Sequence, residues 1–172
     1  MKMAKIFITS PIEENGLNLL RDHEIETVSN EQSRQISRSH LKEIFAKYDG
    51  IITMISDRID EEIIKCASAK FKIIANYGVG FDNIDVLSAK RQGIAVCNTP
   101  GVAAASAAEH TLALILACSK NLIEADRYVR EGKYTKWDSR LFLSHQISGQ
   151  TIGILGLGGI GASVGKIAFG GF

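Results

Sequence analysis

The chain has 172 residues, enough for one ordinary domain or for one domain and part of a second. Hydrophobic residues make up 45% of it and charged residues 23%, close to an average globular protein, which argues against disorder, collagen or coiled coil. The formal net charge of +1 offers no attraction to nucleic acid or an anionic membrane, and no apolar run is long enough to span a bilayer or to act as a secretory signal.

Strand-like and helix-like segments alternate along residues 1–99. Short apolar or β-branched runs predict strands at 5–9, 24–28, 50–54, 72–75 and 94–97. Helical patterns separate them at 15–20, 41–48, 60–67 and 85–92, and Gly93 follows the last as a stop residue. The strands are nearly continuous in apolar residues, which is typical of parallel strands covered on both faces. Residues 1–99 are therefore expected to form a complete flavodoxin-like domain of the α/β class.

The helix predicted at 41–48 has the clearest apolar face. Leu41, Ile44, Phe45 and Tyr48 stand at i, i+3, i+4 and i+7, on one side of a helix. Ser39 comes just before them and is predicted as the N-cap, because its hydroxyl could accept a hydrogen bond from a free amide of the first turn.

The pattern changes after the Asn-Thr-Pro-Gly stretch at 98–101. Ser106 and Glu109 have the spacing of a capping box, and the helix predicted at 106–119 is apolar on nearly every side. Such a helix must be buried, either between domains or between subunits.

Two further segments precede the end of the chain. An amphipathic helix is predicted at 121–131, ended by Gly132. Residues 133–148 are mixed and polar, and we interpret them as a crossing segment in which Tyr134 and Trp137 pack.

The three cysteines are few and widely spread. Cys66, Cys97 and Cys118 form no C-x-x-C pair and no Cys/His cluster, so no metal site is expected. An odd, scattered set of this kind is typical of small buried residues in a reducing compartment, and we expect a cytoplasmic protein.

A glycine-rich fingerprint lies near the end. The apolar run at 151–155 predicts a strand, the sequence Gly-Leu-Gly-Gly-Ile-Gly follows at 156–161, and a helix is predicted from 162 to 168. This is G-x-G-x-x-G in its strand–turn–helix setting. Gly156 would permit a tight turn, Gly158 a close approach to a pyrophosphate, and Gly161 close packing of helix on strand. The alternative is a plain glycine-rich turn, but the flanking elements favour a dinucleotide site.

Two features of this end concern the cofactor and the packing of the last residues. The acidic residue that usually follows the fingerprint by ~20 residues has no counterpart before Phe172, so NAD and NADP cannot be told apart. One strand and part of a helix cannot bury their apolar faces alone. Residues 149–172 are therefore expected to be poorly ordered or to borrow a neighbouring chain.

Three segments together resemble the D-isomer-specific 2-hydroxyacid dehydrogenases. They are Asn-Tyr-Gly-Val-Gly-Phe-Asp-Asn-Ile-Asp at 76–85, Asn-Thr-Pro-Gly at 98–101 with Ala-Ala-Glu-His-Thr at 107–111, and the stretch from Gly149 to Gly161. Their order and spacing fit the family over essentially the whole chain.

The resemblance implies a two-domain enzyme that transfers hydride between nicotinamide and a 2-oxo or D-2-hydroxy acid. Residues 1–99 would be the flavodoxin-like substrate-binding (catalytic) domain. Residues 100–172 would be linker helices and the truncated start of a Rossmann NAD-binding domain. Family members form homodimers, and the 106–119 helix is expected to form that interface.

The family's binding positions fall on identifiable residues. Val79 and Gly80 match the loop whose backbone N–H groups hold the substrate carboxylate, which suits an anion-binding nest. Val79 and Thr111 match positions near the cofactor. The remaining cofactor positions lie in the fingerprint: Gly156, Gly158, Gly159, Ile160 and Gly161. Gly159 stands where many members carry Arg, so a side-chain phosphate contact is lost there.

The polar residues near these positions are expected to have structural roles rather than catalytic ones. Asp82 is expected to be a turn or N-cap residue. Glu109 and His110 are adjacent on a helix and point in different directions, so they are not an acid/base pair, and Glu109 is expected to cap.

The family's catalytic Arg, Glu and His lie downstream of the fingerprint, so none is expected among these residues. The chain is therefore predicted to be a fragment that does not transfer hydride alone. Its motifs favour the glyoxylate or hydroxypyruvate reductases, with D-3-phosphoglycerate dehydrogenase as the alternative. Two other hypotheses are a non-catalytic dimerising module and a small-acid or nucleotide sensor using Val79 and Gly80.

Overall fold

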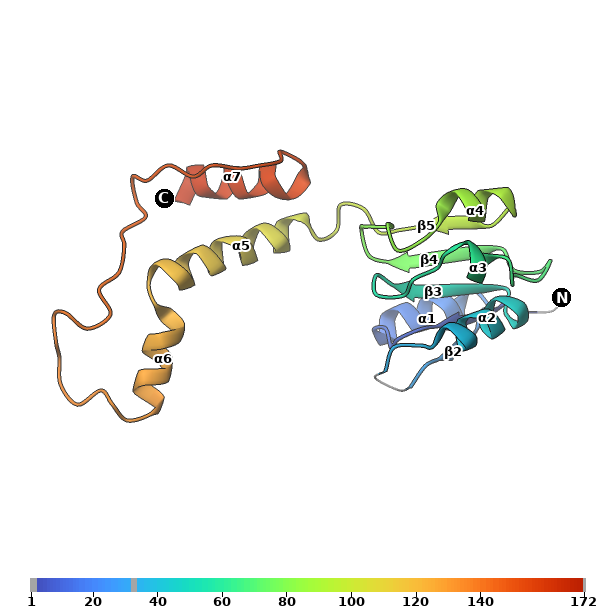
Figure 1. Ribbon diagram of the computed structural model, residues 1–172, viewed down its shortest axis with the longest axis horizontal. Coiled ribbons are helices and arrows are strands. Elements are labelled where there is room, and N and C mark those ends of the chain that lie inside the picture. Colours follow the sequence, from blue (N-terminus) through green and yellow to red (C-terminus); the bar gives the residue numbers. More distant parts are fainter. Residues whose placement is uncertain (1–2, 32–33, 172) are drawn as a thin grey trace. The chain divides into compact units, whose positions relative to one another are not determined.

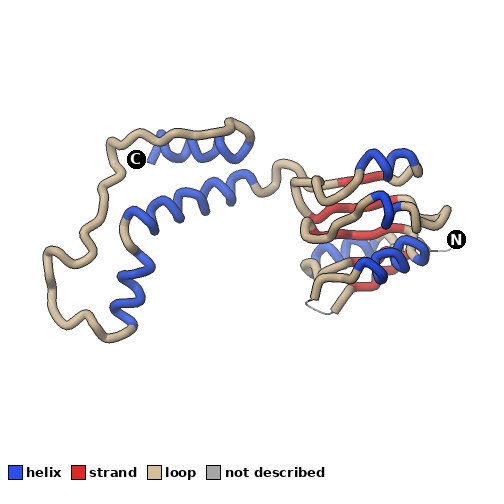
Figure 2. The backbone as a smooth tube through the Cα atoms, viewed as in Figure 1, coloured by secondary structure: helices blue, strands red, loops and turns tan. Residues whose placement is uncertain are grey.

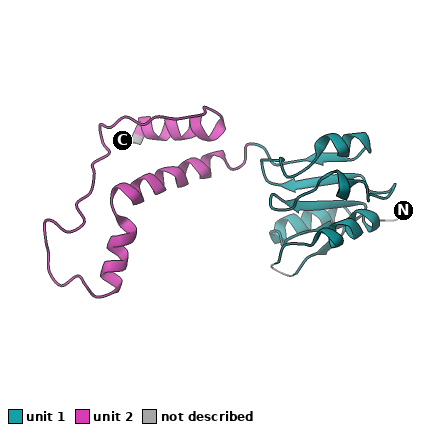
Figure 3. Ribbon diagram, in the orientation of Figure 1, with its two compact units in different colours: residues 1–100 teal, residues 101–172 magenta. Residues whose placement is uncertain are grey.

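The computed structural model describes residues 3–31 and 34–171. The chain forms two compact units, Met1–Pro100 and Gly101–Phe172 (Figure 3). Each unit has its own cluster of buried apolar side chains.

The first unit contains a five-stranded, fully parallel sheet in the order β2-β1-β3-β4-β5 (Figures 1 and 2). Its strands are β1 (Lys5–Ile8), β2 (Glu26–Ser29), β3 (Gly50–Met54), β4 (Ile73–Tyr77) and β5 (Ala95–Cys97). In Figure 1, α1 lies behind the sheet, and α2 and α3 lie in front of it. This is the strand order of flavodoxin-like folds, and the predicted α/β class is confirmed.

Four helices connect the strands: α1 (Glu14–Asp22), α2 (Arg38–Lys47), α3 (Glu61–Ile64) and α4 (Val86–Arg91). The N-cap of α2 is Ser37, whose Oγ accepts the His40 N–H at 3.3 Å. The prediction of Ser39 is wrong because that residue already lies in the first helical turn. Asp85 caps α4, and Gly93, with a φ of +68°, follows its end as predicted.

The helix predicted at 60–67 is much shorter than expected. After α3, the N–H groups of Cys66 and Ala67 bond to the carbonyls of Ile63 and Ile64, three residues back. These tight bonds replace the four-residue spacing of an α-helix and end it after one turn.

The core of this unit lies between the sheet and α2. The predicted apolar face of α2 is confirmed: Leu41, Ile44, Phe45 and Tyr48 are all buried. Phe45 stacks on Phe71 with 4.3 Å between ring centroids. This packing holds the helix and strands rigidly enough to position the loops at the sheet's carboxyl edge.

The second unit contains α5 (Ala104–Ser119), α6 (Leu122–Arg130) and α7 (Gly159–Gly171). The predicted capping box is wrong because α5 begins at Ala104 and places Ser106 inside the helix; its N-cap, Ala103, makes no side-chain hydrogen bond. Gly132, with a φ of +70°, follows the end of α6, as predicted.

Helix α7 packs on α5 through a small apolar cluster of Ala108, Leu112 and Val164. The expectation that residues 149–172 lack internal packing is therefore wrong for this helix. Apolar side chains nevertheless stay exposed on other faces, including Leu114 on α5 and Phe169 on α7. Helix α5 is thus only partly covered within the chain.

Residues 151–155 do not form the predicted strand. A strand needs a neighbour to satisfy its backbone groups, and no described segment pairs with this one. Leu155 is consequently fully exposed.

Several side chains predicted to pack are open to solvent. Cys97 and Cys118 are exposed, contrary to expectation, while Cys66 is half-buried. Trp137 and Tyr134 are also exposed, at 77% and 51%. Within the described residues, no helix has the length and apolar content to cross a membrane, and no cluster of acidic, His and Cys side chains suits a metal ion.

Candidate functional site

The carboxyl edge of the parallel sheet gathers the ends of β3 and β4 and the loops that follow them. Ligands of open α/β sheets bind at this edge. The loop after β4, residues 78–81, contains the predicted substrate residues Val79 and Gly80.

Three successive carbonyls of this loop are held by hydrogen bonds. The Gly78 carbonyl accepts from the Thr99 N–H at 2.9 Å. The carbonyl of Val79 accepts from Asn98 Nδ2 at 2.8 Å, and that of Gly80 from Asn76 Nδ2 at 2.7 Å. These bonds determine the orientation of three consecutive peptide planes.

The N–H groups of the same peptides point the other way. The described peptide bonds are trans, so the N–H of each peptide is directed opposite to its carbonyl. The carbonyls of Gly78 and Val79 both bond to residues 98 and 99, so the N–H groups of Val79 and Gly80 both face away from that segment. Among the described residues no acceptor takes these two, nor the N–H of Phe81. The loop thus presents unpaired donors to a ligand.

Sequence reasoning singled out Val79 and Gly80 but not Phe81, whose amide is likewise unpaired among the described residues. A backbone N–H exists at nearly every residue, so only the direction of the peptide plane could have revealed it. Asp82 lies in a turn, as predicted.

The 78–81 loop needs a small residue at Gly78 because it lies close to the loop that follows β3. A Cβ at Gly78 would overlap the Ile55 side chain. Around the loop the side chains of Ile55, Tyr77, Val79 and Phe81 are about half-exposed and uncharged. The donors therefore stand among apolar side chains, with one charged neighbour: Asp82 Oδ1 lies 3.1 Å from where a Cβ of Gly80 would stand.

A shallow hollow of about 530 Å³ adjoins the loop. It is lined by Ile55, Arg58, Asp82 and their neighbours up to Asp85. Hydrogen bonds from Ser88, first of all from its backbone N–H, lower the pKa of Asp85 from its usual value. Asp85 is thereby committed to capping α4 rather than to proton transfer.

The glycine fingerprint forms the turn into α7 in the second unit. Gly156 has a φ of +92°, which favours glycine and fits the predicted tight turn. A Cβ at Gly161 would overlap the Gly156 carbonyl, so this glycine is needed for close packing. At Gly158 a Cβ would meet no atom within 4 Å, so the chain's own packing does not require a glycine there.

The amino end of α7 carries free donors. In the part of the chain that the structure describes, no acceptor takes the N–H groups of Gly159, Ile160 and Gly161. Exposed amides at a helix N-terminus, with the positive end of the helix dipole, suit phosphate groups. The residues present therefore fit a dinucleotide.

The other predicted residues of this unit, together with Glu109 and His110, lie on α5. The Thr111 hydroxyl donates to the Ala107 carbonyl at 2.7 Å, within α5. Glu109 and His110 are both exposed on the same helix.

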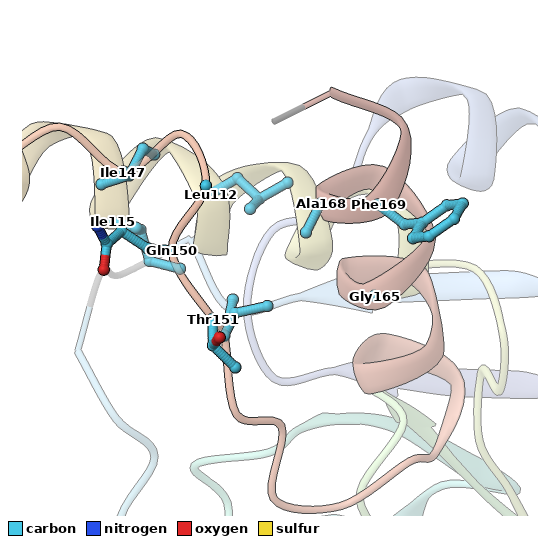
Figure 4. Close-up of a pocket in the computed structure, with 10 residues that line it drawn as sticks. Leu112, Ile115, Ile147, Gln150, Thr151, Gly165, Ala168 and Phe169 are labelled. Carbon is cyan, nitrogen blue, oxygen red and sulfur yellow. The ribbon is translucent and has the colours of Figure 1, made fainter.

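A second hollow, of about 600 Å³, lies between α5, α7 and the segment at 147–152 (Figure 4). Its lining is mostly apolar and includes Leu112, Ile115, Ala168 and Phe169. None of the fingerprint residues lines it, so it is separate from the glycine turn at 156–161.

A doubly wound parallel sheet with free amides at its carboxyl edge, and a glycine turn leading into a helix, are typical of nucleotide-dependent α/β proteins. The sequence matches the family described as D-isomer specific 2-hydroxyacid dehydrogenase, catalytic domain, over residues 6–164. The chain belongs to this family.

Individual relatives agree with this assignment. The chain is 42% identical to glyoxylate reductase of Pyrococcus furiosus over 170 residues, which cover 96% of the chain and 50% of that protein. Identity to glyoxylate reductase of Thermococcus gammatolerans is 43% over 171 residues, with the same shares covered. The chain thus spans about half the length of these relatives.

Solved structures show the same architecture. A protein of Thermus thermophilus matches with a TM-score of 0.91 and 32% identity, over 96% of this chain and 53% of that one. An NADPH-dependent glyoxylate/hydroxypyruvate reductase from Sinorhizobium meliloti, in complex with NADP and malonate, has a TM-score of 0.79 and 25% identity, covering 98% and 51%.

Proposed function

We propose that this chain is the substrate-binding part, with the beginning of the cofactor-binding part, of an NAD(P)-dependent reductase of small 2-oxo acids such as glyoxylate or hydroxypyruvate. The observation that carries the proposal is the row of free N–H groups at Val79, Gly80 and Phe81. Hydrogen bonds to the carbonyls on the other side of the same peptides, those of residues 78–80, hold these N–H groups in place. Residues 1–99 would bind the acid, and residues 100–172 would contribute to the dinucleotide site.

The substrate's carboxylate is the group that these amides would hold. An ionised carboxylate only accepts hydrogen bonds, and each backbone N–H donates one. The loop can therefore bind a carboxylate through its amides alone. Ile55, Tyr77 and Phe81 at the rim carry no charge, which suits a small neutral remainder better than a phosphate. This favours a glyoxylate-type substrate over the alternative, D-3-phosphoglycerate. The reductase relatives named above, and the malonate bound by one of them, support the same substrate class.

A nicotinamide dinucleotide would be held through its phosphates by the turn at 156–161 and the amides at the start of α7. When bound, the cofactor supplies or accepts a hydride. Gly158 leaves room for a close approach, and Gly159 offers its amide but no side chain. Val79 and Thr111 are proposed near the nicotinamide end. NAD and NADP both fit these residues.

On the resemblance, the family's catalytic Arg, Glu and His would lie beyond the fingerprint, so none of these 172 residues is proposed as catalytic. We therefore expect the chain to bind ligands but not to turn them over. We also propose that two copies of the chain pair through α5. The protein is proposed to be cytoplasmic. A non-catalytic dimerising module is the second candidate, favoured by the half-exposed Leu114 on that helix.

The decisive test is a titration of the 172-residue chain followed through its backbone amide NMR signals. Glyoxylate and hydroxypyruvate should shift the signals of Val79, Gly80 and Phe81, and 3-phosphoglycerate should bind more weakly. NADH or NADPH should shift those of residues 156–161. No response to any of these ligands, with a stable dimer in solution, would support the dimerising module instead. Steady-state oxidation of the cofactor by this chain would contradict its inactivity.

A further inference from the structure

We propose that Asn76 and Asn98 are positioning residues that hold the 78–81 loop with its N–H groups presented to an anion. The proposal rests on the function proposed above but concerns residues that do not themselves touch the substrate. Each asparagine bonds to a loop carbonyl. In each of these peptides the carbonyl points in the direction opposite to the free N–H.

Asn76 is buried, with only 2% of its surface exposed, at the position before the last residue of β4. Its Oδ1 accepts from the Thr53 hydroxyl at 2.9 Å and from Asn83 Nδ2 at 3.2 Å. Its Nδ2 donates to the Gly80 carbonyl at 2.7 Å and to Asn83 Oδ1 at 3.2 Å. All four hydrogen-bonding positions of the amide are therefore used.

This pattern allows only one orientation of the Asn76 amide. If its nitrogen and oxygen exchanged places, the oxygen would face the Gly80 carbonyl, which is also an acceptor. Two buried acceptors in contact leave both without a donor, which is costly. The Gly80 peptide is therefore held in one direction by a side chain that cannot turn.

The support for Asn76 extends across the carboxyl edge of the sheet. Asn83 Nδ2 also lies within hydrogen-bonding distance of the carbonyls of Met54 and Asp57, at 3.2 and 2.9 Å, so its two hydrogens are shared among three acceptors. The buried carboxylate of Asp57 in turn accepts from the Thr9 hydroxyl, after β1, and from the Met54 N–H. Buried networks whose members are satisfied rigidify their surroundings. The loop is thus tied to the ends of three strands.

Asn98 holds the neighbouring peptide from the segment after β5. Its side chain is half-buried, and its Nδ2 donates to the Val79 carbonyl at 2.8 Å, beside the bond from the Thr99 N–H to the Gly78 carbonyl. Removing this side chain leaves the core intact, unlike a change at Asn76. Preorganised donors bind more tightly because no ordering is needed on binding.

The test compares three neutral variants of the chain. Asn76→Leu, an apolar isostere, and Asn98→Ala each release one loop carbonyl. Thr53→Val is the matched control, because it removes a buried hydrogen bond to Asn76 without touching the loop. Two quantities are measured: the ¹⁵N order parameters of Val79, Gly80 and Phe81 without ligand, and the affinity for oxalate, a small dicarboxylate, from the same amide signals.

We expect lower order parameters and roughly tenfold weaker oxalate binding in Asn76→Leu and Asn98→Ala, with little change in Thr53→Val. If Asn76→Leu fails to fold, Asn98→Ala decides alone. Unchanged order parameters in the loop of the releasing variants would overturn the proposal, as would an equal loss in the control. If the unchanged chain does not bind oxalate, the proposed substrate site fails, while the order parameters still decide the positioning role.

Discussion

Gly161 in α7 lies against the carbonyl oxygen of Gly156, so closely that a Cβ on Gly161 would overlap it. Its Cβ position is also only 3.2 Å from Ile154 Cγ2, so any side chain there would push the helix away from the preceding segment. The contact brings the turn and the helix start together and leaves the amides of residues 159–161 at the surface.

Replacement of Gly161 by Ala should therefore destabilise the second unit by about 1–3 kcal/mol, the usual cost of overpacking. The measurement is urea unfolding followed by circular dichroism. Gly170→Ala is the matched control, since that position has open space at the end of α7 and the change should leave the stability nearly unchanged. Equal unfolding curves for Gly161→Ala and the unchanged chain would show that the close contact is absent in solution.

Gly158 should behave in the opposite way, because nothing in the chain surrounds it. Gly158→Ala is expected to fold with unchanged stability but to bind NADH or NADPH at least roughly tenfold more weakly, a loss of about 1.4 kcal/mol. Calorimetric titration measures the affinity. Gly153→Ala, also in open space but outside the fingerprint, should bind as the unchanged chain does. Undiminished binding by Gly158→Ala would mean that no phosphate approaches this backbone.

The first unit should lose stability in acid through a surface cluster of charges. Arg38 bonds to Asp60 and Glu62, and Lys42 bonds to Glu62. Hydrogen bonds from Arg38 lower the pKa of Asp60 below its ordinary 3.8, and those from Lys42 and Arg38 lower that of Glu62 below 4.5. A carboxylate with a lowered pKa in the folded state stabilises the fold above its unfolded pKa and loses this effect as pH falls.

The loss should therefore begin near pH 4.5 and continue below pH 3.8, and it should be modest because the groups are exposed. The loss is measured as the difference in the free energy of unfolding between neutral buffer and strongly acidic buffer, which lie above and below this pH range. Denaturant unfolding of the chain gives both values. Arg38→Met should reduce the difference between the two conditions, whereas Arg127→Met, on another surface, should leave it unchanged. A pH dependence that Arg38→Met does not alter would place its origin elsewhere.

Pairing of two copies depends on the apolar face that α5 leaves open. Leu114 is 53% exposed, and a charge there would be costly to bury in an interface. Leu114→Glu should convert a dimer to a monomer in analytical ultracentrifugation. Leu87→Glu serves as the control, because Leu87 is 71% exposed on α4 and lies in the other unit. A monomeric unchanged chain, or a dimer that survives Leu114→Glu, would exclude pairing through α5.

Local patterns predicted the sheet well because each strand carries its own signal. The apolar run at 50–54 became β3 with the predicted bounds, and the periodic face of Leu41, Ile44, Phe45 and Tyr48 is buried as expected. The glycines near 78–80 and 156–161 were informative for a similar reason, since glycine is favoured where backbone must turn sharply or approach closely. The strand predicted at 151–155 failed because pairing depends on a neighbour, not on the run itself.

The sequence by itself determined the α/β class, the order of strands and helices in the first unit, and the two glycine bends, since these follow from hydrophobic periodicity and from backbone freedom at single residues. Only the tertiary structure decided what surrounds those bends: that Ser37 caps α2, that Asn76 meets Thr53 and Asn83, and that Asn98 reaches the Val79 carbonyl. The direction of a peptide plane depends on partners far along the chain. No local pattern of residues encodes that direction, because the fold alone brings the partners together.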